Sequence, residues 1–346
     1  MIIRVAVAGA GYWGINHVRV FASDPGAEVV CVCDPDPEAL VRASAFAPRA
    51  SLVADFEAAL DDRVDALVIA TPAPTHAPLA RRALRANKHI LVEKPVALSA
   101  AEARRLVDEA ARRERVLLAG HLMLYHPVVQ RLSALLRSGE LGELYYLYAR
   151  RVNLGRLRRD ESALWSFGPH DLSLIDAFMG ELPVSVTARG ESYLQAGVAD
   201  VVFVTLRYRS RAMAHIHLSW LDPRKERRLT LVCSKKMVEF DDVASEKLRI
   251  YDKGYERPPA FTNFEEYLSL RHGDIYMPHV PMREPLAAEV SDFLARVRGG
   301  HSGPAAGLAA LRVVQILEAA ERSLERDGAP VPVGESATVD PGGARD

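Results

Sequence analysis

This chain has few cysteines, no long apolar runs and no excess of charge of one sign. Only 3 of its 346 residues are cysteine, too few for a disulfide framework or a spaced metal site. No apolar run is long enough to span a bilayer, and the first residues do not resemble a signal peptide. With 44 basic and 45 acidic residues, the chain has no net field that would recruit nucleic acid or a membrane. We therefore expect a cytoplasmic protein without a metal, nucleic-acid or membrane partner.

The length and composition are those of a globular protein with more than one domain. A chain of 346 residues, 49% hydrophobic and 26% charged, exceeds one ordinary domain and has ample length for a large core. Two domains are therefore predicted.

The first fourteen residues form the most informative stretch of the chain. Residues 2–8 are rich in β-branched side chains and stop abruptly at Gly9, which predicts a buried strand followed by a tight turn. Gly11 would let the backbone approach a pyrophosphate, and Gly14 would let the next helix lie close to the strand. The free N–H groups at the start of that helix attract phosphate. Glycines at this spacing also occur in ordinary turns, so the pattern alone is weak evidence.

The next predicted strand strengthens this interpretation. Residues 28–33 form a second apolar run that ends in Asp34, twenty residues beyond Gly14. A dinucleotide fold places a carboxylate there against the adenosine ribose hydroxyls. Pro35 and Asp36 follow, without an arginine to hold a 2′-phosphate, so the sequence favours NAD over NADP.

Strand and helix patterns alternate through residue 121, which predicts a doubly wound parallel sheet of the Rossmann type in domain 1–121. The pattern then changes to consecutive strands with short connections, which predicts an α+β domain with a mainly antiparallel open sheet over 122–332. Within it, we expect a helix at 168–179, a long loop at 253–284, and helices that begin at 285 and 305. Residues 333–346 are predicted to be a disordered tail.

A second informative stretch follows the strand predicted at 89–92. Glu93, Lys94 and Pro95 place a cation at the carboxyl edge of the sheet, where ligands bind in open α/β folds. A lysine there could hydrogen-bond a substrate hydroxyl and stabilise negative charge that develops on its oxygen. The alternative is a surface ion pair between neighbouring side chains.

Together these motifs resemble the Gfo/Idh/MocA family of nicotinamide-dependent sugar oxidoreductases. The resemblance rests on Gly9-Ala10-Gly11-Tyr12-Trp13-Gly14, Asp34, Ala70-Thr71-Pro72 with His76, Glu93-Lys94-Pro95, Gly120-His121 with Tyr125-His126-Pro127, and the pattern from Gly307 to Leu324 followed by Asp327-Gly328. It spans nearly the whole chain and implies an NAD-dependent dehydrogenase that acts on CH–OH groups.

The resemblance also implies roles for particular residues. Lys94 would be a catalytic or substrate-orienting residue, and His170 would be the acid/base histidine. Four residues before His170 the family often has Asp, whereas this chain has Ser166. Serine cannot stabilise an imidazolium by charge, so the proton relay must be simpler or use another acid, such as Asp171 or Asp176. A helix-capping or core histidine is the alternative for His170.

Further cofactor and substrate contacts are carried over in the same way. The cofactor residues are Gly9, Gly11, Tyr12, Trp13, Gly14, Asp34, Thr71, Pro72, His76, Glu93 and Lys94. Loop packing is the alternative for His76. The substrate residues are Lys94, Tyr125, Asn153, Arg156, Arg158, Arg159, Trp165 and His170. For Tyr125 a core position is equally compatible with the sequence.

The run from 145 to 170 looks like the subgroup that oxidises the 3-hydroxyl of a UDP-N-acetylhexosamine, or of its uronate, before a partner aminotransferase acts on the ketone. Arg156, Arg158 and Arg159 would suit a diphosphate, because guanidinium groups match phosphate oxygens. A solvated basic loop is the alternative. The substrate could instead be a free aldose, an inositol or a sugar phosphate, and some family members bind a dinucleotide without turnover. The resemblance also implies a homodimer or homotetramer.

Overall fold

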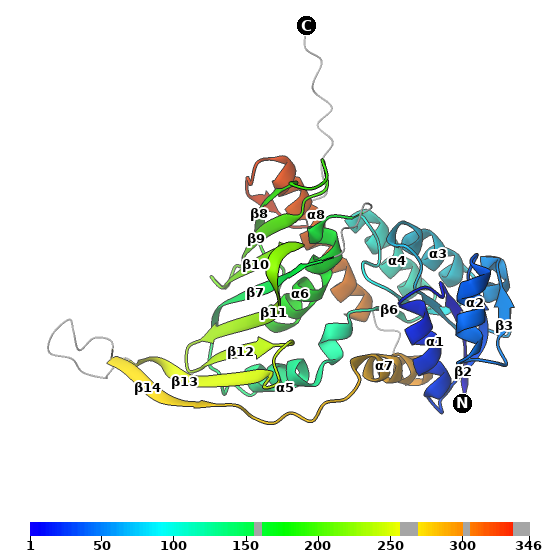
Figure 1. The fold of residues 1–346 in the computed structure, drawn as a ribbon, viewed down its shortest axis with the longest axis horizontal. Coiled ribbons are helices and arrows are strands. Elements are labelled where there is room, and N and C mark those ends of the chain that lie inside the picture. The colour runs from blue at the N-terminus through cyan, green and yellow to red at the C-terminus, as the bar shows by residue number, and fades with distance from the viewer. Residues whose placement is uncertain (156–160, 257–268, 300–304, 335–346) are drawn as a thin grey trace, which may run out of the picture.

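The computed structural model describes residues 1–155, 161–256, 269–299 and 305–334. They form two sheets with helices between and around them (Figure 1). In this part of the chain no helix combines the length and the apolar character needed to cross a membrane.

The first sheet has six parallel strands in the order β3-β2-β1-β4-β5-β6. Its strands are β1 Ile3–Ala8, β2 Ala27–Cys33, β3 Ser51–Val53, β4 Ala66–Ile69, β5 His89–Val92 and β6 Leu117–Ala119. The central strands are buried on both faces, as expected for a parallel sheet covered by helices on both sides. The predicted Rossmann arrangement is confirmed.

Helices connect these strands and continue into the second half of the chain. They are α1 Gly14–Ser23, α2 Pro37–Ser44, η1 Phe56–Leu60, α3 Ala73–Arg85, α4 Ala100–Arg112, η2 Leu122–Tyr125 and α5 Pro127–Arg137. Ser99 caps α4 by accepting a hydrogen bond from the Glu102 N–H, and its hydroxyl contacts the Glu102 carboxylate.

The second sheet has nine strands in the order β14-β13-β12-β11-β7-β10-β9-β8-β15. They are β7 Leu144–Leu154, β8 Ser185–Glu191, β9 Val201–Arg207, β10 Met213–Ser219, β11 Leu221–Cys233, β12 Met237–Asp241, β13 Leu248–Glu256, β14 Ser269–Tyr276 and β15 Val331–Pro332. Within the described residues all pairs are antiparallel except β7 with β10. The predicted, mainly antiparallel sheet is therefore confirmed.

Two predicted boundaries were wrong. The segment 253–284 is not one long loop, because β13 continues to Glu256 and β14 pairs with it. Most β14 side chains are exposed, so the segment lacks the apolar alternation that reveals a strand. Helix α6 spans Ala163–Met179 and begins five residues before the predicted start, with Ser162 as its N-cap. Pro169 lies inside this helix, although proline is more common in a first turn.

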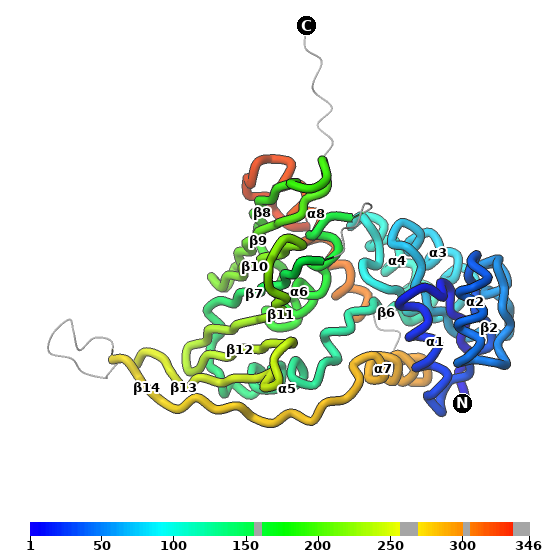
Figure 2. The backbone as a smooth tube through the Cα atoms, in the orientation of Figure 1, coloured from blue at the N-terminus to red at the C-terminus, as the bar shows by residue number. Residues whose placement is uncertain are grey.

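The last helices join the two halves of the molecule. Helix α7 (Pro285–Gly299) packs on the first sheet, where Phe293 meets Phe21 of α1 edge to face. The preceding chain crosses from β14 back to α7 along one side of the molecule (Figure 2). Helix α8 (Ala305–Glu325) contacts α4 and β6 of the first half and α6 and β8 of the second. One buried apolar core therefore continues from the first sheet into the second.

Candidate active site

The glycine turn after β1 is built for close approach of a ligand to the backbone. Gly9 has a φ of +89°, and a side chain on Gly14 would place its Cβ 1.7 Å from the Gly9 carbonyl oxygen. At Gly11 a Cβ would meet no atom within 4 Å, so this side of the turn is open. Helix α1 begins directly after the turn, and its N-terminus favours an anion. The turn therefore fits the pyrophosphate of a dinucleotide.

Asp34, at the end of β2, is hydrogen-bonded to this turn. One carboxylate oxygen accepts the Ala10 N–H at 2.6 Å, and the other accepts the Asp36 N–H at 2.8 Å. Each carboxylate oxygen can accept more than one hydrogen bond, so Asp34 can still bind ribose hydroxyls. Tyr12 is 85% exposed at the tip of the turn.

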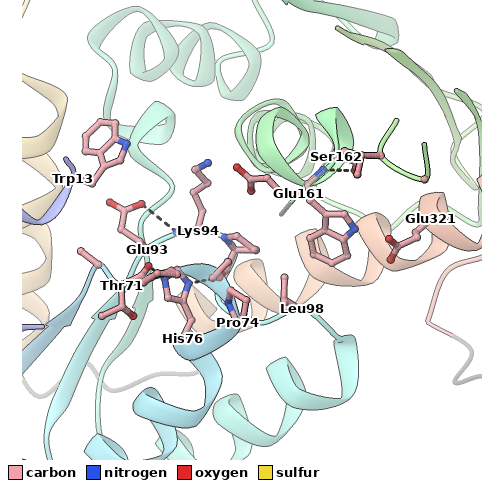
Figure 3. A pocket seen from close by; sticks show the side chains of 17 residues that line it. Trp13, Thr71, Pro74, His76, Glu93, Lys94, Leu98, Glu161, Ser162 and Glu321 are labelled. Atoms are coloured by element: carbon pink, nitrogen blue, oxygen red, sulfur yellow. Dashed lines mark hydrogen bonds between the residues drawn. The ribbon is translucent and has the colours of Figure 1, made fainter. Parts of the chain in front are cut away.

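A cleft of about 540 Å³ lies where the two halves of the molecule meet (Figure 3). Seven predicted site residues line it: Trp13, Thr71, Pro72, His76, Glu93, Lys94 and Trp165. Ser162, Val198 and Glu321 complete its far side and were not predicted from the sequence. The cleft thus combines the carboxyl edge of the first sheet with the start of α6.

His76 ties together the two loops that follow β4 and β5. Its Nε2 lies 2.7 Å from the Thr71 carbonyl oxygen, and its Nδ1 lies 2.7 Å from the Pro95 carbonyl oxygen. The ring is buried, and the Lys94-Pro95 peptide bond is cis. His76 therefore contacts protein through both nitrogens, and its observed role is to hold the loop that carries Lys94.

Lys94 reaches from the first sheet across to α6. Its ammonium donates a hydrogen bond to the Ser166 carbonyl oxygen at 3.1 Å. Figure 3 shows its side chain extending from the end of β5 towards the segment that carries Glu161. The backbone of Ser166, rather than its hydroxyl, is therefore the group that meets the cation.

His170 lies one helical turn beyond Ser166 and is half-buried. Burial lowers the pKa of His170 well below its ordinary value, and the nearby charges of Lys94 and Arg151 lower it further. A lowered pKa keeps the imidazole neutral at pH 7, the form that can accept a proton. Although His170 is not among the residues lining the cleft, it lies within electrostatic range of Lys94.

The two acids considered as partners for His170 are engaged elsewhere. Asp171 forms a two-pronged ion pair with Arg151 of β7, at 2.7 and 3.0 Å. Asp176 forms another with Arg312 of α8, at 2.7 Å for both contacts. The charges that lower the pKa of His170 are cationic. Both acids are therefore already paired with arginines rather than with His170.

Glu93 has a partner that the sequence did not reveal. Its Oε1 lies 2.8 Å from Nε2 of His17 on α1, and its Oε2 accepts the Lys94 N–H at 3.2 Å. Burial raises the pKa of Glu93, but the hydrogen bond from His17 and the charges of His17 and Lys94 outweigh burial, so the pKa is lowered. His17 and Glu93 are 76 residues apart, so no local pattern in the sequence reveals the pair.

The remaining predicted substrate residues are placed differently. The Tyr125 hydroxyl donates to Asp292 of α7 at 2.6 Å, so this residue does not line the cleft. Asn153 is half-buried on β7. The three arginines of the basic loop, Arg156, Arg158 and Arg159, lie outside the described residues. Within those residues no group of three or more His, Cys, Asp or Glu side chains could hold a metal ion.

Comparison with known proteins matches both halves of the chain to one family. Residues 3–121 match the family model described as "Oxidoreductase family, NAD-binding Rossmann fold", and residues 129–239 match the "GFO/IDH/MocA C-terminal domain". Together these two matches span most of the chain.

Individual relatives are similar over nearly their whole length. The chain is 28% identical over 336 residues to the UDP-N-acetylglucosamine 3-dehydrogenase of Acidithiobacillus ferrooxidans, covering 94% of this chain and 99% of that protein. It is 27% identical over 337 residues to the inositol 2-dehydrogenase of Rhizobium meliloti (strain 1021), covering 94% and 97%. A protein from gentamicin A biosynthesis solved in complex with NAD is 26% identical, with a TM-score of 0.80 over 96% of this chain and 97% of that one. The chain therefore belongs to the Gfo/Idh/MocA family of oxidoreductases, and its N-terminal Rossmann domain binds NAD.

Proposed function

We propose that this oxidoreductase oxidises a sugar hydroxyl to a ketone where Lys94 and His170 converge. The observation that carries the proposal is the contact of the Lys94 ammonium with the Ser166 carbonyl, because it brings a cation from one sheet within one helical turn of an imidazole from the other domain. A neutral imidazole can accept the proton of an alcohol, and a cation can stabilise the negative charge that develops on its oxygen.

The roles of the two side chains follow from their charges. When bound, NAD would supply the hydride acceptor for the carbinol carbon, and oxidation of the alcohol to a ketone would leave one proton for the protein to remove. His170, neutral at pH 7, accepts that proton from the hydroxyl. Lys94 stabilises the negative charge that develops on the oxygen.

Lys94→Met tests this assignment because it removes the charge and keeps most of the side-chain volume. We expect turnover to fall by about two to three orders of magnitude while the Kd for NAD changes little. Lys88→Met is the control, since Lys88 is a buried lysine of the same domain that is bound to the carbonyls of Asp61 and Val64. Retained turnover in Lys94→Met would contradict the proposal.

The 3-hydroxyl of a UDP-N-acetylhexosamine is the substrate we propose. The UDP-N-acetylglucosamine 3-dehydrogenase of A. ferrooxidans supports this choice, because the similarity covers almost all of both chains. Inositol 2-dehydrogenase of R. meliloti is almost as similar, so an inositol, a free aldose or a sugar phosphate is the alternative. Purified protein with NAD should be assayed on UDP-N-acetylglucosamine, myo-inositol and free aldoses, following NADH formation and the product's loss of two hydrogens by mass spectrometry.

A regulator that binds NAD without turnover is the alternative of another class. Lys94 and His170 are both present and close together, which favours catalysis. Reduction of NAD with any substrate of the panel would exclude a purely regulatory role. NAD binding without turnover on every substrate would instead favour that role.

We further propose that two copies of the chain pair through the open face of the second sheet. Aromatic side chains line part of this face: Tyr146 stacks on Tyr148, and Phe203 stacks on His217 at 4.4 Å. Tyr146, Tyr148 and Phe203 are 42–44% exposed, and exposed apolar side chains gathered on one face are typical of a protein–protein interface. A monomer in solution scattering, unchanged by Phe203→Glu, would contradict the pairing.

A further inference from the structure

Three buried side chains around Glu93 have polar atoms without hydrogen-bond partners in the described part of the chain. They are His17 through Nδ1, His121 through both ring nitrogens, and Glu289 through both carboxylate oxygens. His17 and Glu289 are fully buried, and His121 is 6% exposed. Buried polar groups are normally paired, so an unpaired group in a native fold calls for a function or for bound water.

Of the three, His121 stands closest to the proposed chemistry. It follows β6, the strand next to β5, and is the N-cap residue of η2, which packs against both α6 and α7. The preceding residue touches Glu93 directly, because a Cβ on Gly120 would lie 3.2 Å from Glu93 Oε2. Gly120 thus lets the end of β6 approach the Glu93 carboxylate, and His121 lies beside it.

The charged neighbours of His121 are of both signs. Burial lowers the pKa of His121 to about 4; the Glu93 charge raises it and the Lys94 charge lowers it. A charge on His121 would in turn lower the pKa of His170. His121 is therefore in electrostatic range of Lys94, of His170 and of the anionic Glu93, and Glu93 in turn interacts with His17 and Glu289.

The surroundings of His170 destabilise its protonated form. Once protonated by the substrate, His170 would be a cation beside Lys94, Arg151 and Arg227. The two nearby acids on its own helix are occupied by arginines. The proton must therefore leave, and like charges drive it away from these cations and towards an anion.

We propose that His121 relays the proton of the oxidised hydroxyl from His170 to Glu93. This proposal rests on the proposed function. A neutral imidazole has one ring nitrogen that accepts and one that donates, and in His121 both are unused. Neither ring nitrogen of His121 is hydrogen-bonded to His170 or to Glu93, so each transfer passes through a bridging water. His121 takes on one nitrogen the proton that comes from His170 and gives the proton of its other nitrogen towards Glu93. Ring charge and electron count are unchanged, and Glu93, which lines the cleft, releases the proton to solvent.

His121→Asn tests the relay, because an amide can hold the same water or neighbour by hydrogen bonds but cannot pass a proton on. We expect kcat to fall by about 10²-fold, with the KM for NAD little changed. The solvent deuterium isotope effect on kcat should increase, and kcat should partly recover at alkaline pH, where hydroxide can take the proton from His170.

His126→Asn is the matched control. His126 is five residues away and also buried, but its Nδ1 accepts the Val128 N–H, its Nε2 faces Asp242, and its ring packs on Phe240. This variant should lose stability without a new isotope effect. The pH dependence of kcat should also be measured for Glu289→Gln. Any part of the profile that this substitution removes comes from the Glu289 carboxyl and not from the relay.

The outcomes separate the two proposals. Full kcat in His121→Asn, or a loss of kcat with an unchanged isotope effect and pH profile, would overturn the relay and leave the proposed function standing. A wild-type protein that oxidises no substrate of the panel would overturn the proposed function and the relay with it.

Discussion

The buried ion pair between Arg151 and Asp171 allows a direct test of what stabilises the helix that carries His170. It joins β7 to the helix that carries His170, one residue from the proposed base. We consider Asp171→Asn, which keeps the shape of the side chain and removes its charge. Among the described residues, the substitution leaves Arg151 without an anionic partner.

The expected cost follows from the burial of the pair. The two contacts are 2.7 and 3.0 Å long, and the side chains of Arg151 and Asp171 are only 8% and 5% exposed. Breaking such a pair by removing one partner typically costs about 3–5 kcal/mol, because the remaining charge stays buried without compensation. For a domain of this size, that corresponds to a Tm lower by roughly 6–20 °C.

Urea unfolding of the variant and the wild type measures this difference. Asp327→Asn is the control, because the Arg189–Asp327 contact is 3.7 Å long and its side chains are 68% and 94% exposed. That variant should cost no more than about 1 kcal/mol. Replacing both buried partners, as Arg151→Met with Asp171→Leu, should recover most of the stability. The reasoning is refuted if Asp171→Asn costs no more than the exposed control.

Three further predictions concern the cofactor turn, a buried carboxyl and the proposed base. Gly14→Ala places a Cβ 1.7 Å from the Gly9 carbonyl oxygen, so calorimetry should show NAD binding weakened by roughly tenfold or more. Burial raises the pKa of Glu289 well above 4.5. Wild-type stability should therefore fall as pH rises above 4.5 towards the folded-state pKa, by up to about 1.4 kcal/mol per pH unit, and urea unfolding of Glu289→Gln should show a flatter dependence. Because burial and then Lys94 lower the pKa of His170 below 6.5, the acid limb of kcat/KM from this group should lie below pH 6.5, and NMR titration should find a higher pKa in Lys94→Met.

Much of the first domain could be predicted because its signals are local. Buried parallel strands appear as continuous apolar runs, and the glycine turn and Asp34 lie within one βαβ unit. Lys94 was predicted for the same reason, since it directly follows a strand at the edge where ligands bind. The structure then adds what spacing cannot give: the ammonium meets a backbone carbonyl 72 residues away.

The failures have a common physical cause, which is that the deciding partner is distant in the sequence. Strand β14 has mostly exposed side chains, so only its pairing with β13 defines it. Asp171 and Asp176 looked available as acids because the arginines that bind them lie 20 and 136 residues away. For Tyr125 the sequence left a core position open, and its partner Asp292 is 167 residues away.

The alignment of Lys94 with His170 depends on helices that carry neither residue. Helix α7 covers apolar side chains of the first domain, such as Val5 and Phe21, and α8 packs on both domains at once. The two sides of the cleft are thus fixed to one continuous core, and they should move together rather than as free domains. A chain ending before residue 285 would keep every residue proposed for catalysis. It would nevertheless lose the packing that brings the Lys94 ammonium near the His170 imidazole. Formation of the site therefore depends on the whole fold and not on the sequence motifs alone.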